Sequence, residues 1–111
     1  MKYRLALRNL EEVCGQRIKQ VRVVGGGSKN RLLNQFTANA TGRRVLIGPA
    51  EATALGNIAI QILATREASS LEEVRAIVDC SFPTEVFEPS STDKWERHFQ
   101  RFAQYCEMTY A

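Results

Sequence analysis

The chain is short and mildly basic, and its charges are interleaved. It has 111 residues, with 15 Lys and Arg against 12 Asp and Glu, for a formal net charge of +3. This length suits one small domain or part of a larger one. No run of five like charges occurs, so a nucleic-acid partner is not indicated. No signal peptide opens the chain and no apolar run reaches the ~18 residues of a membrane helix, so no membrane partner is expected.

Three cysteines are spread along the chain, and their spacing argues against a metal site. Cys14, Cys80 and Cys106 form no C-x-x-C pair and no zinc-type spacing with the single histidine, His98. Free thiols are typical of a reducing compartment. The sequence therefore predicts a cytoplasmic location and no metal ligands.

An amphipathic helix is predicted over residues 3–14, because apolar residues recur on one face of that segment. Gly15 is a natural stop signal. Met1 and Lys2 lead straight into the helix without a capping residue. This abrupt start suggests a chain cut from something longer.

A strand, a glycine turn and a helix are predicted next. Residues 21–24 are rich in β-branched valine, which favours a strand. Gly25, Gly26 and Gly27 follow without a break, which indicates a positive φ or a close approach to the backbone. Ser28 is the predicted N-cap of a helix that runs to about Ala40. The free N–H groups of such a helix start would suit an anion, and phosphate is the usual one.

The glycines admit several interpretations. The P-loop string G-x-x-x-x-G-K-[ST] does not occur. The dinucleotide fingerprint G-x-G-x-x-G fits at Gly25 and Gly27 but fails at Asn30, where the third glycine belongs. A different nucleotide loop would bring bare backbone against the α-phosphate and adenosine of ATP. A tight turn without a ligand also remains open, because a glycine cluster alone is weak evidence.

A second strand and an apolar helix follow. Residues 43–47 are predicted as a strand that Gly48-Pro49 ends. Residues 51–65 are apolar on nearly every face, so a buried helix is expected. Gly56 in mid-helix costs about 1 kcal/mol relative to alanine, and close approach of another backbone would justify it.

Two helices complete the pattern. Ser70 and Glu73 have the spacing of a capping box at the start of a helix that reaches Val78. The segment 79–89 is mixed, and its apolar residues Phe82, Val86 and Phe87 suit either a short strand or packing. A last helix runs from 91 to about 108, with an aromatic face that suits a core or an interface. The pattern predicts an α/β fold with more helix than strand. Two strands are too few to cover so much helix, so either a larger domain or an oligomer is expected to complete it.

Two motifs in register resemble the FGGY family of carbohydrate kinases. The string GGGSKNRLLNQFTANATG, residues 25–42, resembles the C-terminal nucleotide-binding segment of the family. The string GPAEATALGNI, residues 48–58, resembles the next family signature at the expected separation. The combination is most similar to the L-rhamnulose kinase branch, and the resemblance covers essentially the whole chain.

The resemblance implies the C-terminal part of an actin-like, ribonuclease H-like ATPase fold. Residues 1–111 would be a single partial domain carrying the nucleotide-binding segment, with the N-terminal sugar-binding domain absent. The complete enzyme would use Mg²⁺ to transfer the γ-phosphoryl of ATP to the 1-hydroxyl of L-rhamnulose, leaving ADP. The implied partners are an adenine nucleotide and the remainder of the kinase, and the piece could also self-associate.

The resemblance also assigns residues. Gly26 would contact the nucleotide, Asn30 would reach the adenine side, and Gly25 and Gly27 would shape the loop, with Ser28 as a further candidate. No catalytic residue is assigned: Glu51 matches a signature position that is not the family's base. A chain that holds only part of the ATP side is expected to be inactive alone.

Other functions stay open at this point. The same loop could serve a non-catalytic nucleotide-binding module, or the chain could be an oligomerisation module that pairs through residues 51–65. The equivalent segment of a xylulose, gluconate or glycerol kinase would carry the same loop.

Overall fold

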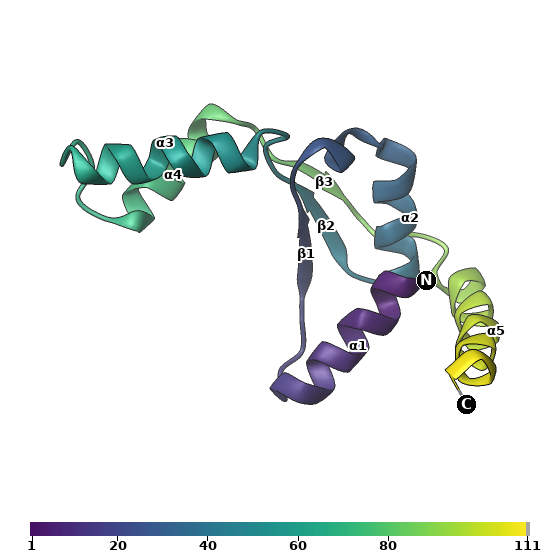
Figure 1. The fold of residues 1–111 in the computed structure, drawn as a ribbon. Coiled ribbons are helices and arrows are strands. Elements are labelled where there is room, and N and C mark those ends of the chain that lie inside the picture. The colour runs from purple at the N-terminus through teal and green to yellow at the C-terminus, as the bar shows by residue number, and fades with distance from the viewer. Residues whose placement is uncertain (111) are drawn as a thin grey trace. The chain divides into compact units, whose positions relative to one another are not determined.

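The computed structural model describes residues 1–110, and side chains as far as residue 108. Five α-helices, one short 3₁₀-helix and three strands are present in this part of the chain (Figure 1). In chain order they are α1 (Lys2–Cys14), β1 (Gln20–Val23), η1 (Gly26–Lys29), α2 (Arg31–Thr41), β2 (Arg44–Ile47), α3 (Ala52–Ala64), α4 (Leu71–Ser81), β3 (Glu85–Phe87) and α5 (Thr92–Tyr110). The strands form one sheet in the order β1-β2-β3. The predicted helix-rich α/β fold is confirmed, with one strand more than the two expected.

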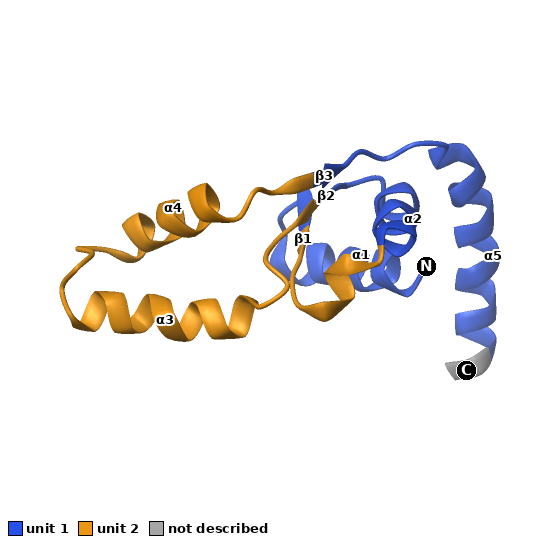
Figure 2. Ribbon diagram, turned by 90° about the horizontal axis from the view of Figure 1, so that it is seen from above, with its two compact units in different colours: residues 1–21, 31–45, 86–111 blue, residues 22–30, 46–85 orange. Residues whose placement is uncertain are grey.

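The chain divides into two compact units (Figure 2). Unit 1 comprises residues 1–21, 31–45 and 86–111, and so contains α1, α2 and α5. Unit 2 comprises residues 22–30 and 46–85, and contains η1, α3 and α4. The glycine loop and the long apolar helix thus belong to the same unit.

Unit 1 is built on α2, which packs against both α1 and α5. Helix α1 ends as predicted, with Gly15 at φ 65° donating its N–H to the carbonyl of Glu11. On α5, Phe99 is only 6% exposed. The ring of Trp95 lies 5.2 Å from that of Phe36 on α2, centre to centre. The aromatic face predicted for the last helix therefore packs inside this unit.

A buried amide connects α2 to the segment before α5. The Asn39 side-chain oxygen accepts from the backbone N–H of Ser90 at 2.8 Å and from its hydroxyl at 3.2 Å. The same oxygen accepts from the Gln35 amide at 2.8 Å. Asn39 is 8% exposed, so the acceptor end of these bonds is shielded from water, and the bonds tie the segment before α5 to α2.

The chain segments that leave β1 and β2 run side by side in unit 2. Gly48 donates its N–H to the carbonyl of Val23 at 2.8 Å, and Gly25 donates to that of Pro49 at 3.2 Å. The two segments therefore run in the same direction, as parallel strands do. Parallel strands need a crossover connection between them. A Cβ on Gly48 would lie 2.7 Å from Cγ1 of Val24, so only glycine allows this approach.

In unit 2, α4 begins with the predicted cap and packs against α3. The Ser70 hydroxyl accepts from the backbone N–H of Glu73 at 3.1 Å. The carboxylate of Glu73 reaches back to the N–H and hydroxyl of Ser69, at 2.8 and 2.7 Å. The Glu73 side chain of the capping box thus accepts from Ser69, one residue before the predicted N-cap Ser70. At its other end, α4 continues to Ser81 instead of stopping at Val78.

The prediction that the helix at 51–65 is buried was wrong for this chain. Helix α3 has the predicted extent, but none of its residues is buried, and Ile58 and Ile60 are 53% and 61% exposed. Helix α4 covers only one side of it. The expected backbone contact at Gly56 is also missing, since a Cβ there would have no atom within 4 Å. The apolar composition of α3 indicates that other segments should cover it, and the described residues cover it only in part.

Candidate functional site

The glycine loop begins with a backbone conformation that only glycine adopts readily. Gly25 has φ 85° and ψ −173°, a region that is essentially closed to residues with a Cβ. Its N–H donates to Pro49, which fixes the loop against the segment after β2. The first glycine is therefore explained by the turn itself.

Ser28 is not at the N-cap position of α2, which corrects the predicted helix start. It lies inside η1, where its N–H and its hydroxyl both donate to the carbonyl of Gly25, at 3.0 and 2.6 Å. A serine that closes such a local turn stabilises an alternative to the helix. Helix α2 begins three residues later at Arg31. Consequently one 3₁₀ turn lies between the first glycine and the start of α2.

Gly26 and Gly27 are not explained by the fold of the described chain. Neither has a positive φ. A Cβ built on either would meet nothing within 4 Å. Both are exposed. Alanine would fit at both positions, so the chain itself gives no reason to keep bare backbone there.

The five predicted site residues come together in one turn of unit 2, but they are not equally accessible. Ser28 is 5% exposed, whereas Gly26, Gly27 and Asn30 are exposed. The Asn30 N–H donates to the carbonyl of Gly27 at 3.2 Å, which places Asn30 directly after the 3₁₀ turn. A ligand can therefore reach the second and third glycines and Asn30, while Ser28 supports the turn from inside.

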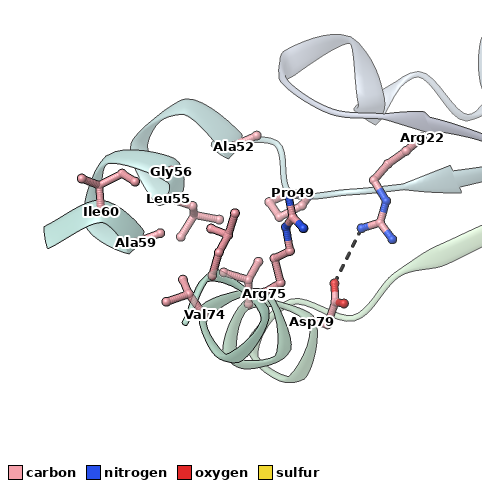
Figure 3. A pocket seen from close by; sticks show the side chains of 12 residues that line it. Arg22, Pro49, Ala52, Leu55, Gly56, Ala59, Ile60, Val74, Arg75 and Asp79 are labelled. Atoms are coloured by element: carbon pink, nitrogen blue, oxygen red, sulfur yellow. Dashed lines mark ion pairs between the residues drawn. The ribbon is translucent and has the colours of Figure 1, made fainter. Parts of the chain in front are cut away.

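A second feature of unit 2 was not predicted: a cavity of about 680 Å³ between α3 and α4 (Figure 3). Leu55, Ala59 and Val74 form part of its apolar wall. Arg22 and Asp79 line it too and form an ion pair at 3.6 Å. The apolar periodicity of residues 71–78 indicated a helix with an apolar face. It could not indicate a cavity, because the depth of a cavity depends on how two helices cross.

The described residues contain no group of three His, Cys, Asp or Glu side chains that could hold a metal ion. Over the same residues, no helix combines the length and the apolar character needed to cross a membrane. The described residues therefore offer two candidate features in unit 2, an exposed glycine loop and a cavity.

Sequence comparison shows that the chain is similar to a known protein family and to several curated proteins. Residues 1–65 match the model of the FGGY family of carbohydrate kinases, C-terminal domain. A rhamnulokinase of Bacteroides thetaiotaomicron is 40% identical over 102 residues, which is 92% of this chain and 21% of that protein. Rhamnulokinases of Bacillus subtilis and Enterococcus faecalis are 41% and 42% identical over 83% and 82% of the chain, and 19% of each protein.

The chain spans about a fifth of the length of these curated relatives. The family model itself covers more than half of the chain, including β1, the glycine loop, α2, β2 and α3. By this match, and in agreement with the resemblance in its two motifs, the chain belongs to the FGGY family of carbohydrate kinases, within the family's C-terminal domain.

Proposed function

We propose that this chain is the adenine-nucleotide-binding portion of a kinase that phosphorylates L-rhamnulose. The kinase transfers the γ-phosphoryl of ATP to the 1-hydroxyl of the sugar with the help of Mg²⁺, and it acts in the cytoplasm. The relatives named rhamnulokinase support this choice of sugar. In this proposal residues 1–111 are one partial domain, and the sugar site and the general base belong to the rest of the kinase.

The observation that carries the proposal is the bare backbone of Gly26 and Gly27. Their glycine identity is required neither by φ nor by a neighbouring protein atom. A ligand that packs directly on the backbone would supply the missing reason, because glycine permits the closest approach. Gly26 then contacts the nucleotide with Gly27 beside it, Asn30 reaches its adenine side, and Gly25 and Ser28 hold the loop in shape.

An amide ¹H–¹⁵N NMR titration of the 111-residue chain with ADP, and then with Mg-ATP, tests this proposal. We expect saturable shifts centred on Gly25, Gly26, Gly27 and the Asn30 side chain. Shifts elsewhere, or none in a well-dispersed spectrum, would mean that the loop is a structural turn in this chain.

A pair of glycine-to-alanine variants sharpens the test. Gly26→Ala should fold normally, because its Cβ has open space and its φ is ordinary. The added methyl group should nevertheless weaken ADP binding by about tenfold or more, since overpacking a close contact costs about 1–3 kcal/mol. Gly56→Ala is the matched control: it also has open space, but it lies on α3 outside the loop and should leave ADP binding unchanged.

The division of labour between this chain and the rest of the kinase can be tested directly. Phosphoryl transfer requires both substrates to be positioned with the metal. We therefore expect the chain alone to show no turnover of L-rhamnulose with Mg-ATP. Measured turnover would show that the sugar site lies within these 111 residues.

A further inference from the structure

Unit 1 contains a polar cavity that plays no part in the proposed nucleotide site. Its volume is about 300 Å³, and five charged side chains line it: Arg4, Arg8, Glu11, Arg43 and Glu96. Three guanidinium groups thus face two carboxylates, an excess of one positive charge. Such an excess favours an anion, provided that the arginines are not all committed to their neighbours.

Two of the arginines are held by the two glutamates. Arg4 forms an ion pair with Glu96 across α1 and α5. Arg43 donates to the carboxylate of Glu11 at 3.1 Å. Hydrogen bonding first from the Ile18 N–H and then from Arg43 lowers the pKa of Glu11, so this carboxylate stays ionised at neutral pH. The two pairs fix the walls of the cavity without using every donor.

Arg43 keeps one donor without a partner. Its Nε is buried and has no hydrogen-bond partner among the described residues. The Arg43 side chain as a whole is 19% exposed. A buried charged donor that lacks a protein acceptor is costly, so Arg43 keeps unmet hydrogen-bonding capacity beside the cavity that it lines.

Arg8 supplies the second group, and it is held only weakly. Its nearest carboxylate is that of Glu12 on the same helix, at 4.0 Å, which is the outer limit of an ion pair. Its guanidinium lies 5.7 Å from the centre of the Phe99 ring, over which Arg4 lies at 4.1 Å. The aromatic ring thus gathers two positive groups at one wall of the cavity, and the Arg8 side chain remains half exposed.

We propose that this cavity binds a phosphate-type oxyanion between Arg8 and Arg43. Guanidinium groups recognise such anions through paired N–H donors in a planar fork. The volume is at the lower end of the range for ligand pockets, which suits a single phosphate group. The phosphate group could be inorganic phosphate or part of a small organic phosphate.

Titration of the ¹⁵N-labelled chain with inorganic phosphate at constant ionic strength tests the proposal. We expect saturable shifts of the Arg8 and Arg43 Nε–Hε signals with a millimolar dissociation constant. The amides of Gly26 and Gly27 report the nucleotide loop in the same spectra, so phosphate binding there is distinguished from binding in the cavity. Non-saturable shifts of the arginine signals would overturn the proposal.

Two matched variants make the test specific. Arg8→Gln should weaken phosphate binding about tenfold or more, because a hydrogen bond to a charged group is worth about 1.5–3 kcal/mol. Arg97→Gln makes the same change on α5 without touching the cavity lining, and should leave binding unchanged. An equal effect of both variants would reduce the site to nonspecific charge attraction and overturn it.

A second probe identifies the source of the phosphate group. Glycerol phosphate should bind more tightly than inorganic phosphate if the site takes an organic phosphate. Equal affinity would assign the site to the ion itself. In both cases the nucleotide proposal stands or falls separately, on the response of the glycine loop to ADP.

Discussion

The two units treat their apolar residues differently. In unit 1, α2 lies against α1 and α5, and residues such as Ala38, Val45 and Phe99 are buried. In unit 2, α3 is the more apolar helix, yet it buries none of its residues. The comparison shows that an apolar helix needs other segments to cover it. This need is met only where the chain provides such segments. Unit 1 meets it mainly on α2, since α1 also buries none of its residues, and unit 2 leaves α3 half covered.

The largest effect on stability is expected when one large apolar side chain in each unit is replaced by alanine. Phe99→Ala should cost about 3 kcal/mol of unfolding free energy, because it opens a cavity around a side chain that is 6% exposed. Ile60→Ala should cost less than about 0.5 kcal/mol, because Ile60 is 61% exposed and alanine favours the helix. Urea unfolding measures both.

The urea slope should stay the same in the two variants, which confirms that only stability changed. Similar losses for Phe99→Ala and Ile60→Ala would show that α3 is covered in solution, for example by a second copy of the chain. A size measurement at the same protein concentration would identify that case.

The next effect concerns the buried amide of unit 1. Asn39→Ala removes the acceptor shared by the Ser90 backbone N–H, the Ser90 hydroxyl and the Gln35 amide, and should cost about 2 kcal/mol, since each hydrogen bond contributes about 1 kcal/mol. Ser90→Ala is the milder control, because it deletes only the 3.2 Å hydroxyl bond and keeps the backbone bond. Thermal unfolding should rank Asn39→Ala well below Ser90→Ala; the reverse order would argue against the backbone bond as the main tie.

A smaller effect is expected at the cap of α4 in unit 2. Ser70→Ala removes the acceptor for the Glu73 N–H and should cost about 1 kcal/mol. Ser70→Asp keeps an acceptor at the same position and should retain most of the stability. If both variants lose the same amount in urea unfolding, the cap does not limit the stability of α4.

The smallest expected effect is a pH dependence that arises at Glu11. Its folded-state pKa is lowered, chiefly by the Ile18 N–H and next by Arg43. The folded state therefore binds this proton less readily than the unfolded state. The stabilisation is complete above the ordinary glutamate pKa and is lost as the pH falls through the lowered value.

Melting temperatures of the native chain and Glu11→Gln should therefore differ at neutral pH and converge in acid. The variant controls for the other acid groups, including Glu73, whose pKa is also lowered, by its bonds to Ser69. A constant gap at every pH would assign the effect to packing of the side chain instead of its charge.

Most of the helices could be predicted because their signals are local. Gly15 and Ser70 act through neighbours within a few residues, and these positions behave as expected in α1 and α4. The glycine loop was also placed correctly, since Gly25 has the positive φ that three adjacent glycines suggested. The start of α2 was missed because Ser28 had two local options, and its bond to Gly25 favoured the 3₁₀ turn.

What the sequence by itself determined is therefore the series of elements, the glycine turn and, through two motifs, the kinase family. The tertiary structure alone decided which side chains meet. The Arg43–Glu11 pair joins residues 32 positions apart, and the Arg4–Glu96 pair joins residues 92 apart. It also showed that Gly26 and Gly27 face open space and that α3 lacks a complete cover. Local signals cannot specify such facts, because burial and pairing depend on segments that are distant along the chain.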